Sequence, residues 1–441
     1  MNAIPELQVR TADAPNHAPH TLTYRDETHQ RLPHVVKFSG GRSSAMLLFT
    51  LLENGILKQE RGDVVVFNNT ACEHPETYRF VAECKRRVER TYRVPFFLTE
   101  FQTYEDARRG RWRRLQSYRL VNDRPRARDN PNGFHWRGEV FEELVSHKAY
   151  LPNRHRRVCT AELKLGPTRA FLADWLAGKP EIGALGHGCA QSRVDLDEMC
   201  ELHRRAGGAV PRAILIGKRR YALGRPTRRP AQAYADFSDA ARPFDNPEVA
   251  PHVFGGRTDL GKNAAEYVVL IGLRNDEPAR IARVRSRNSD PHAKAGHDGE
   301  HVYMPFESMG VTRDDVNQFW SRQSCDLGLD PEAELSNCVY CFMKGARKLG
   351  TVHAAMCDPQ PTSGFGPTAG TPSDIRWWQR IEEKYGRDLV AENRMRRERG
   401  GTDEPTRIGF FGLNRLDYRG VSAPATLTAY DKSIPACACT S

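Results

Sequence analysis

Short apolar runs alternate with amphipathic segments over the first hundred residues of the chain. The pattern predicts strands at 34–38, 63–68 and 95–99, and helices at 43–54 and 75–92. Strands that alternate with helices favour parallel pairing with right-handed crossovers. We therefore expect an α/β fold built on a doubly wound, mostly parallel sheet.

The pattern is less regular in the rest of the chain. We expect a buried strand at 266–272 and helices at 167–177, 312–322 and 373–385. Residues 101–150 are charged and aromatic without a clear strand, so we expect a helical insertion that covers the ligand-binding site. The predicted division is an N-terminal extension at 1–32, a main domain at 33–350 with insertions at about 101–150 and 190–263, and a helical C-terminal extension with a flexible tail at 351–441.

A glycine turn connects the first predicted strand to the first helix. Gly40 and Gly41 allow the backbone to approach an anion without interference from a Cβ atom. Ser39, Ser43 and Ser44 add hydroxyl donors at a helix N-terminus, where free N–H groups and the helix dipole favour negative charge. Such a turn also occurs in α/β proteins that bind no ligand. It is not a Walker A loop, but it indicates ATP as a candidate ligand.

Residues 39–44 resemble the Ser-Gly-Gly-x-Asp-Ser loop, or PP-loop, of the ATP-pyrophosphatases, with Ser43 at the acidic position. Later segments, in the same order, resemble the phosphoadenosine phosphosulfate reductases and their relatives; they are residues 69–77, 157–167, 268–280, 304–316 and 337–344. The resemblance covers about residues 33–350. It implies an adenine nucleotide α-hydrolase-like fold and an enzyme that splits ATP between the α and β phosphates to adenylate a substrate.

The resemblance also implies which residues bind and act on ATP. The implied catalytic residues are Ser39, Arg42, Lys164 and Arg274. The implied nucleotide-binding residues are Phe38, Ser39, Gly40, Gly41, Arg42, Ser43, Ser44, Asn68, Asn69, Thr70, Glu73, Arg274 and Arg280. Loops beyond the carboxyl ends of the strands should bring these residues together, since ligands of open α/β sheets bind there.

Several of these residues have a structural alternative. Glu73 and Glu76 are candidates to hold the Mg²⁺ that accompanies ATP, because carboxylate oxygens suit that ion, or they simply order the start of a helix. The forked guanidinium of Arg274 can clamp phosphates, or it can pair with Asp276 or Glu277. The sequence leaves both alternatives open.

Cysteine spacing is a second chemical signal. Cys338 and Cys341 have the spacing of metal ligands. In the resembling reductases, and in the ATP-pyrophosphatase component of bacterial DNA phosphorothioation, such cysteines hold a [4Fe–4S] cluster. The resemblance implies Cys159 as the third ligand. Cys325 is the first choice for the fourth, because Val158 stands where the reductases have another cysteine.

Zinc is the alternative metal. Cys338, Cys341, His353 and Cys357 have the spacing of a local tetrahedral site. Cys357 is also the second choice for the fourth cluster ligand. Two thiols of the predicted tail either carry sulfur or belong to an ordinary terminus; they are Cys437 and Cys439. Four further cysteines are expected to pack as small apolar residues; they are Cys72, Cys84, Cys189 and Cys200.

Composition and charge limit the partners. The net charge is +11, and arginines concentrate at 108–114, 218–229 and 394–397. Aromatic residues lie among the first cluster, which favours nucleic-acid binding; a solvated, ion-paired surface is the alternative. No apolar stretch approaches the roughly 18 residues that cross a membrane. Eleven cysteines fit metal or sulfur chemistry better than a disulfide framework, so we expect a cytoplasmic protein.

The preferred interpretation is an ATP pyrophosphatase that adenylates a substrate oxygen for replacement by sulfur, as in bacterial DNA phosphorothioation. Its expected partners are ATP with Mg²⁺, DNA, a cysteine desulfurase and other phosphorothioation proteins, and no membrane. Three alternatives remain open. They are a phosphoadenosine phosphosulfate reductase, a tRNA thiolation enzyme, and a nucleic-acid-binding module in which the loop has lost catalysis because Ser43 replaces the acid.

Overall fold

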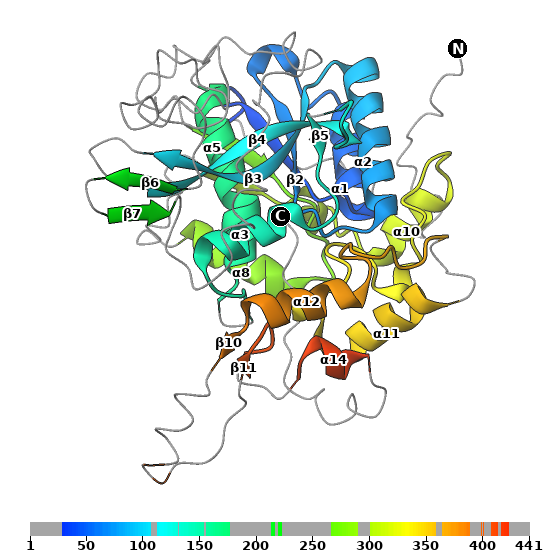
Figure 1. The fold of residues 1–441 in the computed structure, drawn as a ribbon. Helices are drawn as coiled ribbons and strands as arrows, with labels where there is room; N and C mark the ends of the chain where they lie inside the picture. The colour runs from blue at the N-terminus through cyan, green and yellow to red at the C-terminus, as the bar shows by residue number, and fades with distance from the viewer. Residues whose placement is uncertain are drawn as a thin grey trace.

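A seven-stranded, mostly parallel sheet forms the centre of the protein (Figure 1). The computed structural model describes residues 29–106, 113–130, 132–153, 156–176, 213–216, 219–222, 266–289, 300–358, 364–388, 398, 400, 407–412 and 416–422. The strand order is β5-β4-β3-β2-β1-β8-β9. These strands are β1 (His34–Phe38), β2 (Val64–Asn69), β3 (Phe96–Asp106), β4 (Arg113–Pro125), β5 (Gly133–Phe134), β8 (Tyr267–Leu270) and β9 (Glu300–Tyr303).

Strand pairing confirms the expected α/β class. β1 pairs in parallel with β2 on one side and with β8 on the other, and the parallel arrangement continues outward to β3 and β9. β4 is antiparallel to β3, and β5 pairs in parallel with β4. The predicted strands at 34–38, 63–68 and 266–272 are confirmed to within two residues at either end, because their apolar runs are buried.

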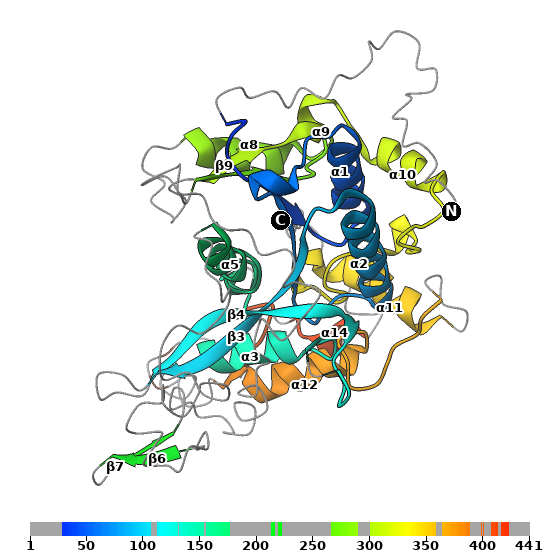
Figure 2. The ribbon, with the colours of Figure 1, turned by 90° about the horizontal axis from the view of Figure 1, so that it is seen from above.

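Helices cover both faces of the sheet (Figure 2). α1 and α2 share a buried cluster with Val36 and Phe67, whereas α5 and α8 share the other cluster with Val35 and Val66. Successive residues of a strand point to opposite faces, so one strand serves both clusters. The helices are α1 (Arg42–Glu53), α2 (Pro75–Arg87), α3 (Glu139–Lys148), α4 (Val158–Thr160), α5 (Gly166–Leu176), α8 (Pro278–Ser289), α9 (Pro305–Ser308), α10 (Arg313–Ser321), α11 (Gly345–Cys357), α12 (Ile375–Tyr385) and α14 (Tyr418–Val421).

The segment after β3 differs from its prediction. A helical insertion without strands at 101–150 is wrong, because β3 and β4 form a long antiparallel pair that precedes α3. Charged side chains inside the protein hide the strand pattern. Arg119 is only 2% exposed, and it donates to Glu100 Oε2 at 2.8 Å and to Glu143 Oε2 at 3.4 Å. Since buried charges are tolerated when paired, these polar residues occupy positions where a strand pattern requires apolar ones.

The C-terminal helices belong to the same buried core as α1, α2 and α3. Trp378 of α12 and Tyr418 of α14 pack around Phe410, and Phe410 also contacts Phe141 of α3. Figure 1 shows α12 and α14 side by side below the sheet. The described part of the predicted C-terminal extension is therefore packed against the main domain.

Glu382 of α12 fastens the last described segment. Its Oε1 accepts a hydrogen bond from the Phe410 N–H at 3.0 Å, and its Oε2 accepts one from the Tyr418 N–H at 2.9 Å. Burial raises the pKa of Glu382 from 4.5 to about 7, although the two backbone hydrogen bonds act in the opposite direction. The segment is thus held by a carboxyl that loses its proton only near neutral pH.

Other predictions fall mainly on residues that the structure does not describe. Most of the 190–263 insertion lies outside the described ranges; within it, β6 (Ala213–Ile216) and β7 (Arg219–Ala222) form an antiparallel pair. A second short pair joins β10 (Arg387–Asp388) to β11 (Arg407–Ile408). None of the described helices combines the length and apolar character needed to cross a membrane.

Replacing Arg119 by alanine should destabilise the fold strongly. The change removes the guanidinium from two buried carboxylates, and breaking a buried ion pair on one side costs about 3–5 kcal/mol. Arg86→Ala is the matched control, because Arg86 pairs with Glu83 on an exposed part of α2 and exposed pairs contribute about 0–1 kcal/mol. Urea unfolding curves should show a large decrease in the free energy of unfolding for Arg119→Ala and little change for Arg86→Ala. Equal losses in both variants would contradict the role of this network.

Stability should fall as the pH rises from about 4.5 to about 7, in part because of Glu382. The unfolded chain ionises this carboxyl from about 4.5 upward, whereas the folded chain keeps its proton until about 7, so the contribution present at low pH is lost across that window. Glu382→Gln mimics the protonated form and should remove on the order of 2 kcal/mol of this pH dependence. Urea unfolding at several pH values measures it; parallel profiles for both proteins would refute the assignment.

Candidate functional site

The loops after β1 and β8 meet where the strand order reverses. From β1 the chain continues to β2 and β3 on one side, and it later adds β8 and β9 on the other. Ligands of open α/β sheets bind outside the carboxyl ends of the strands at such a switch point. A Cβ atom on Gly272, after β8, would lie 3.0 Å from the backbone oxygen of Ser43. Glycine therefore lets this loop pack closely on the start of α1.

The glycine turn has a backbone shape that its sequence explains. Gly40 has a φ of +76°, and a Cβ atom there would lie 2.8 Å from Thr77 Cγ2 on α2. Ser44 Oγ accepts hydrogen bonds from the Ser39 N–H at 3.2 Å and from the Ser39 hydroxyl at 2.9 Å, and it donates to the Gly41 carbonyl at 2.9 Å. The serines therefore hold the turn in shape as well as supplying hydroxyl groups.

The N-terminus of α1 is open to an anion. Gly41 is the residue before the helix, so no side chain of the described chain caps it, and its first turn carries no acid. The first N–H groups of a helix lack partners within it, and the helix dipole adds partial positive charge. Arg274, in the loop after β8, donates to Ser43 Oγ at 3.0 Å and to Asp276 Oδ1 at 2.9 Å. A guanidinium and a helix N-terminus thus converge, as phosphate binding requires.

Arg42 and Arg280 differ from Arg274 in their partners. Arg42 Nε donates to Asp326 Oδ1 at 2.7 Å, which directs this guanidinium to the loop after α10. Arg280 pairs with Glu277, three residues before it on the chain. A phosphate would have to compete with these acids. It would also have to compete at Arg274, which pairs with Asp276 at 2.9 Å and with Glu277 at 3.8 Å. Arg274 is therefore the predicted arginine whose side chain contacts the glycine turn.

The asparagines of the loop after β2 are engaged within the protein. Asn69 is fully buried; its Nδ2 donates to Glu100 Oε1 and to the His135 carbonyl, both at 2.6 Å, and its Oδ1 accepts from the Ala71 N–H at 2.8 Å. These bonds occupy the Asn69 side chain, and its predicted contact with the nucleotide stays a prediction. Asn68 is half-buried and donates to a threonine hydroxyl of α5 at 2.8 Å. Both side chains position the loop.

Glu73 orders the same loop. Its carboxylate accepts hydrogen bonds from the Thr70 hydroxyl at 2.7 Å, the Cys72 N–H at 3.2 Å and the Tyr78 hydroxyl at 3.1 Å. Burial and the charge of Glu73 raise the pKa of Tyr78 well above its usual range. Glu76 accepts a hydrogen bond at 2.6 Å from an arginine of α2. These contacts favour the ordering role over magnesium binding for both acids.

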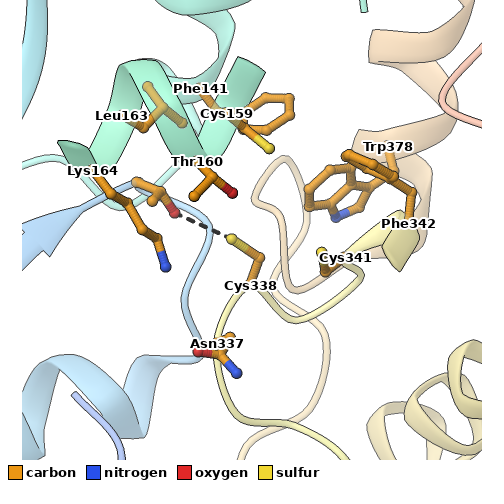
Figure 3. Close-up of a pocket in the computed structure, with 11 residues that line it drawn as sticks. Phe141, Cys159, Thr160, Leu163, Lys164, Asn337, Cys338, Cys341, Phe342 and Trp378 are labelled. Carbon is orange, nitrogen blue, oxygen red and sulfur yellow. Dashed lines mark hydrogen bonds between the residues drawn. The ribbon is translucent and has the colours of Figure 1, made fainter. Parts of the chain in front are cut away.

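A pocket rich in sulfur lies where the β2 loop, α4 and the turn before α11 meet (Figure 3). We call it the thiol pocket. The space between its walls and in the solvent at its mouth amounts to about 440 Å³. Its wall contains three thiols, four polar residues and three aromatic residues, namely Cys159, Cys338, Cys341, Thr70, Thr160, Lys164, Asn337, Phe141, Phe342 and Trp378. Three predicted metal ligands and Lys164 are therefore brought together next to the end of β2.

Cys72 is a neighbour of this pocket that the sequence analysis missed. The Val339 N–H donates to the Cys72 carbonyl at 3.0 Å. A hydrogen bond from Cys72 lowers the pKa of the Cys338 thiol; burial raises it, and Lys164 and Thr70 lower it further. Thiolates are the form that binds metals. The prediction that Cys72 simply packs as an apolar residue is incomplete, and its place two residues after Thr70 was the available signal.

The position of Cys325 does not favour it as the fourth ligand, because it is not among the residues that line the thiol pocket. It lies half-buried beside α2, where burial and then Glu83 raise its pKa, while Arg79 lowers it. Cys357 is exposed on α11, and its Sγ lies 3.7 Å from Nδ1 of His353. The spacing of Cys325 and Cys357 from Cys338 in the sequence does not indicate which loops contact Cys338 in the fold.

The predicted metals differ in how well the described residues fit them. In the described ranges, no three His, Cys, Asp or Glu side chains are close enough together to hold a metal ion. The zinc site predicted at Cys338, Cys341, His353 and Cys357 is therefore not assembled. A [4Fe–4S] cluster binds each thiolate through a different iron, so its ligands lie farther apart than those of one ion. The three thiols around the thiol pocket therefore fit a [4Fe–4S] cluster better than they fit a single metal ion.

Comparison with known proteins does not show a family. No protein-family model matches the chain, and no solved structure matches it. Over 51 residues, which are 11% of the chain, it is 57% identical to a protein described as "Uncharacterized nin region protein ORF290" from Escherichia phage lambda. The chain covers 16% of that protein's length. A match of this extent assigns no activity.

Two groups of predicted residues lie outside the part of the chain whose side chains the structure describes. The first is the arginine clusters at 108–114, 218–229 and 394–397. The second is four of the cysteines, namely Cys189, Cys200, Cys437 and Cys439. The predictions for nucleic-acid binding and for a sulfur-carrying tail therefore remain predictions from sequence.

Gly40→Ala should cost more stability than Gly55→Ala. Both glycines have positive φ, 76° and 63°, so alanine costs about 1–2 kcal/mol at either position. At Gly40 the added methyl also meets Thr77, whereas nothing lies within 4 Å of it at Gly55. We expect a further loss of about 1–3 kcal/mol from this overlap, measured by urea unfolding. Similar losses in the two variants would mean that the turn adjusts without resistance.

Proposed function

We propose that the protein is a PP-loop ATP pyrophosphatase that adenylates a substrate oxygen, so that sulfur can replace it. The observation that carries this proposal is the open start of α1, with Arg274 on Ser43, at the same edge of the sheet as the thiol pocket. The loops after β1, β2 and β8 contribute to this edge because these strands are parallel neighbours. Phosphate binding and sulfur chemistry are therefore adjacent.

In this proposal the phosphates of ATP lie against the N-terminus of α1. The first N–H groups of the helix and the hydroxyls of Ser39 and Ser43 bind phosphate oxygens. A substrate oxygen attacks the α-phosphorus, the bond from that phosphorus to the bridging oxygen breaks, and pyrophosphate leaves. Arg274 stabilises the charge that builds during the attack. Mg²⁺ would bind mainly to the phosphates of ATP, as is usual for this ion. Glu73 and Glu76 are less available to it, because they already accept hydrogen bonds from protein groups.

The thiol pocket serves the second half of the proposed reaction. Cys159, Cys338 and Cys341 would hold a [4Fe–4S] cluster, which supplies redox and sulfur-binding capacity when bound. Lys164 lies close enough to Cys338 to favour its thiolate. A persulfide supplied by a cysteine desulfurase would then attack the substrate atom that carries the activated oxygen, and AMP would leave with that oxygen. Two electrons from a thiol reductant would cleave the remaining S–S bond and leave the sulfur on the substrate.

DNA is the proposed substrate, in the manner of bacterial phosphorothioation and in the cytoplasm. The support is the net charge of +11 with its arginine clusters, together with the resemblance given above. A reductase of phosphoadenosine phosphosulfate is less well supported, because Val158 replaces one cysteine of the reductase pattern. A tRNA substrate would require the same activation chemistry, so the assay must compare the two nucleic acids.

Pyrophosphate release tests the proposal directly. With ATP, Mg²⁺ and DNA, the wild type should release pyrophosphate, and Arg274→Ala should lower kcat about 10²–10³-fold, as loss of one transition-state donor does. Arg285→Ala is the control, since Arg285 is 64% exposed on α8 and pairs with Glu307. Ser39→Ala should also reduce the rate, because it loosens the turn.

The substrate is assigned by replacing DNA with tRNA in the same assay. Stimulation by DNA alone supports the phosphorothioation form of the proposal. A wild-type protein that is inert with ATP, with or without nucleic acid, would refute pyrophosphatase activity and favour the binding module in which Ser43 marks lost catalysis.

A further inference from the structure

The thiol pocket contains three thiols, whereas a [4Fe–4S] cluster usually takes four. Cys72 lies next to the pocket on the β2 loop. The Val339 N–H donates to the Cys72 carbonyl at 3.0 Å, and Glu73 and Cys338 form an antiparallel β-bridge. These two backbone contacts fix Cys72 and Cys338 as neighbours on adjacent chain segments.

The side chains of these two cysteines also meet. The Cys72 thiol hydrogen-bonds to Cys338, and Cys72 is close enough to Cys159 for their charges to interact. Burial raises the pKa of Tyr418 on α14 well above its usual range, and the charges of Cys341, Cys338 and Cys72 raise it further. The four cysteines therefore lie near one another, where the β2 loop, α4 and the turn before α11 meet.

We propose that Cys72 is the fourth thiolate ligand of an iron–sulfur cluster held with Cys159, Cys338 and Cys341. This inference rests on the cluster that the proposed function includes, but not on ATP cleavage. It replaces Cys325, which lies beside Glu83 and Arg79 of α2, and Cys357, which is exposed on α11. Unlike these two, Cys72 contacts a thiol of the pocket wall, that of Cys338. The proposed site also uses residues of three separate segments, which is why cysteine spacing could not reveal it.

The burial of Cys72 suits a metal ligand. The side chain has no exposed surface. A buried thiolate needs a positive charge nearby in place of its lost hydration. Iron would supply that charge, and ligand binding would release the thiol proton.

Cysteine variants test the assignment in the full chain, purified without oxygen. Iron, acid-labile sulfide, visible absorbance and electron paramagnetic resonance should show a [4Fe–4S] cluster in the wild type. Cys72→Ala should lose it or retain a three-iron form, with at least a several-fold fall in four-iron signal. Cys84→Ala is the control, because Cys84 is equally buried, on α2, and the cysteine whose charge acts on it is Cys325 rather than Cys338. A full cluster in Cys72→Ala would overturn the proposal.

A stability measurement covers the case in which Cys72→Ala folds poorly. Cluster-loaded wild type should resist urea better than cluster-stripped wild type, since a group that binds only the folded state stabilises it. This gain should disappear in Cys72→Ala and remain in Cys84→Ala. A Cys72→Ala protein that is unfolded while stripped wild type stays folded would assign Cys72 to packing and refute the ligand role.

The same preparations separate this inference from the proposed activity. A wild-type protein that contains no iron after purification but releases pyrophosphate would support the pyrophosphatase and overturn the Cys72 site. A full cluster that depends on Cys72, in a protein that never cleaves ATP, would support the Cys72 site and refute the pyrophosphatase.

Discussion

The bridge between Glu73 and Cys338 joins the end of β2 to the turn that carries two of the pocket cysteines. The Val339 N–H donates a second hydrogen bond between the two segments, to the Cys72 carbonyl, and Lys344 Nζ donates to the Val339 carbonyl at 2.8 Å. We call the paired segments, residues 71–73 and 337–339, the join. Since β2 is a central strand of the sheet, this pairing transfers its fixed position to a turn far along the chain. Without the bridge, the thiol pocket would lose the wall formed by the β2 loop.

The same join contains two strained residues. Ala71 has a φ of 60° and Asn337 a φ of 61°, and each directly precedes a cysteine of the join. For alanine this backbone shape costs about 1–2 kcal/mol, and the resembling segment of the reductases has glycine there. Such strain persists where neighbouring contacts fix the chain. Asn69 supplies one of them by accepting a hydrogen bond from the Ala71 N–H at 2.8 Å, which explains why its amide is used inside the protein.

The sequence predicted the features that depend on local pattern. Apolar runs located β1, β2 and β8, and the glycine turn located the start of α1, because each follows from a few consecutive residues. It located the first part of β3, at 95–99, but missed the rest of β3 and all of β4. Arg119 and its buried carboxylate partners interrupt the apolar pattern that marks a strand. The sequence also did not indicate that Cys72 contacts Cys338. Thr70 contacts Cys338 across 268 positions, and no spacing within a single segment encodes such a contact.

Charge balance explains why the two halves of the candidate site use different cations. Arg274 lies at the start of α1, where its charge adds to the helix dipole and suits phosphate. Lys164 lies beside Cys338, where it favours a thiolate. One ammonium cannot neutralise four thiolates in a buried space, because like charges at short range raise one another's pKa. The gathered cysteines therefore either stay largely protonated or share a multivalent metal group.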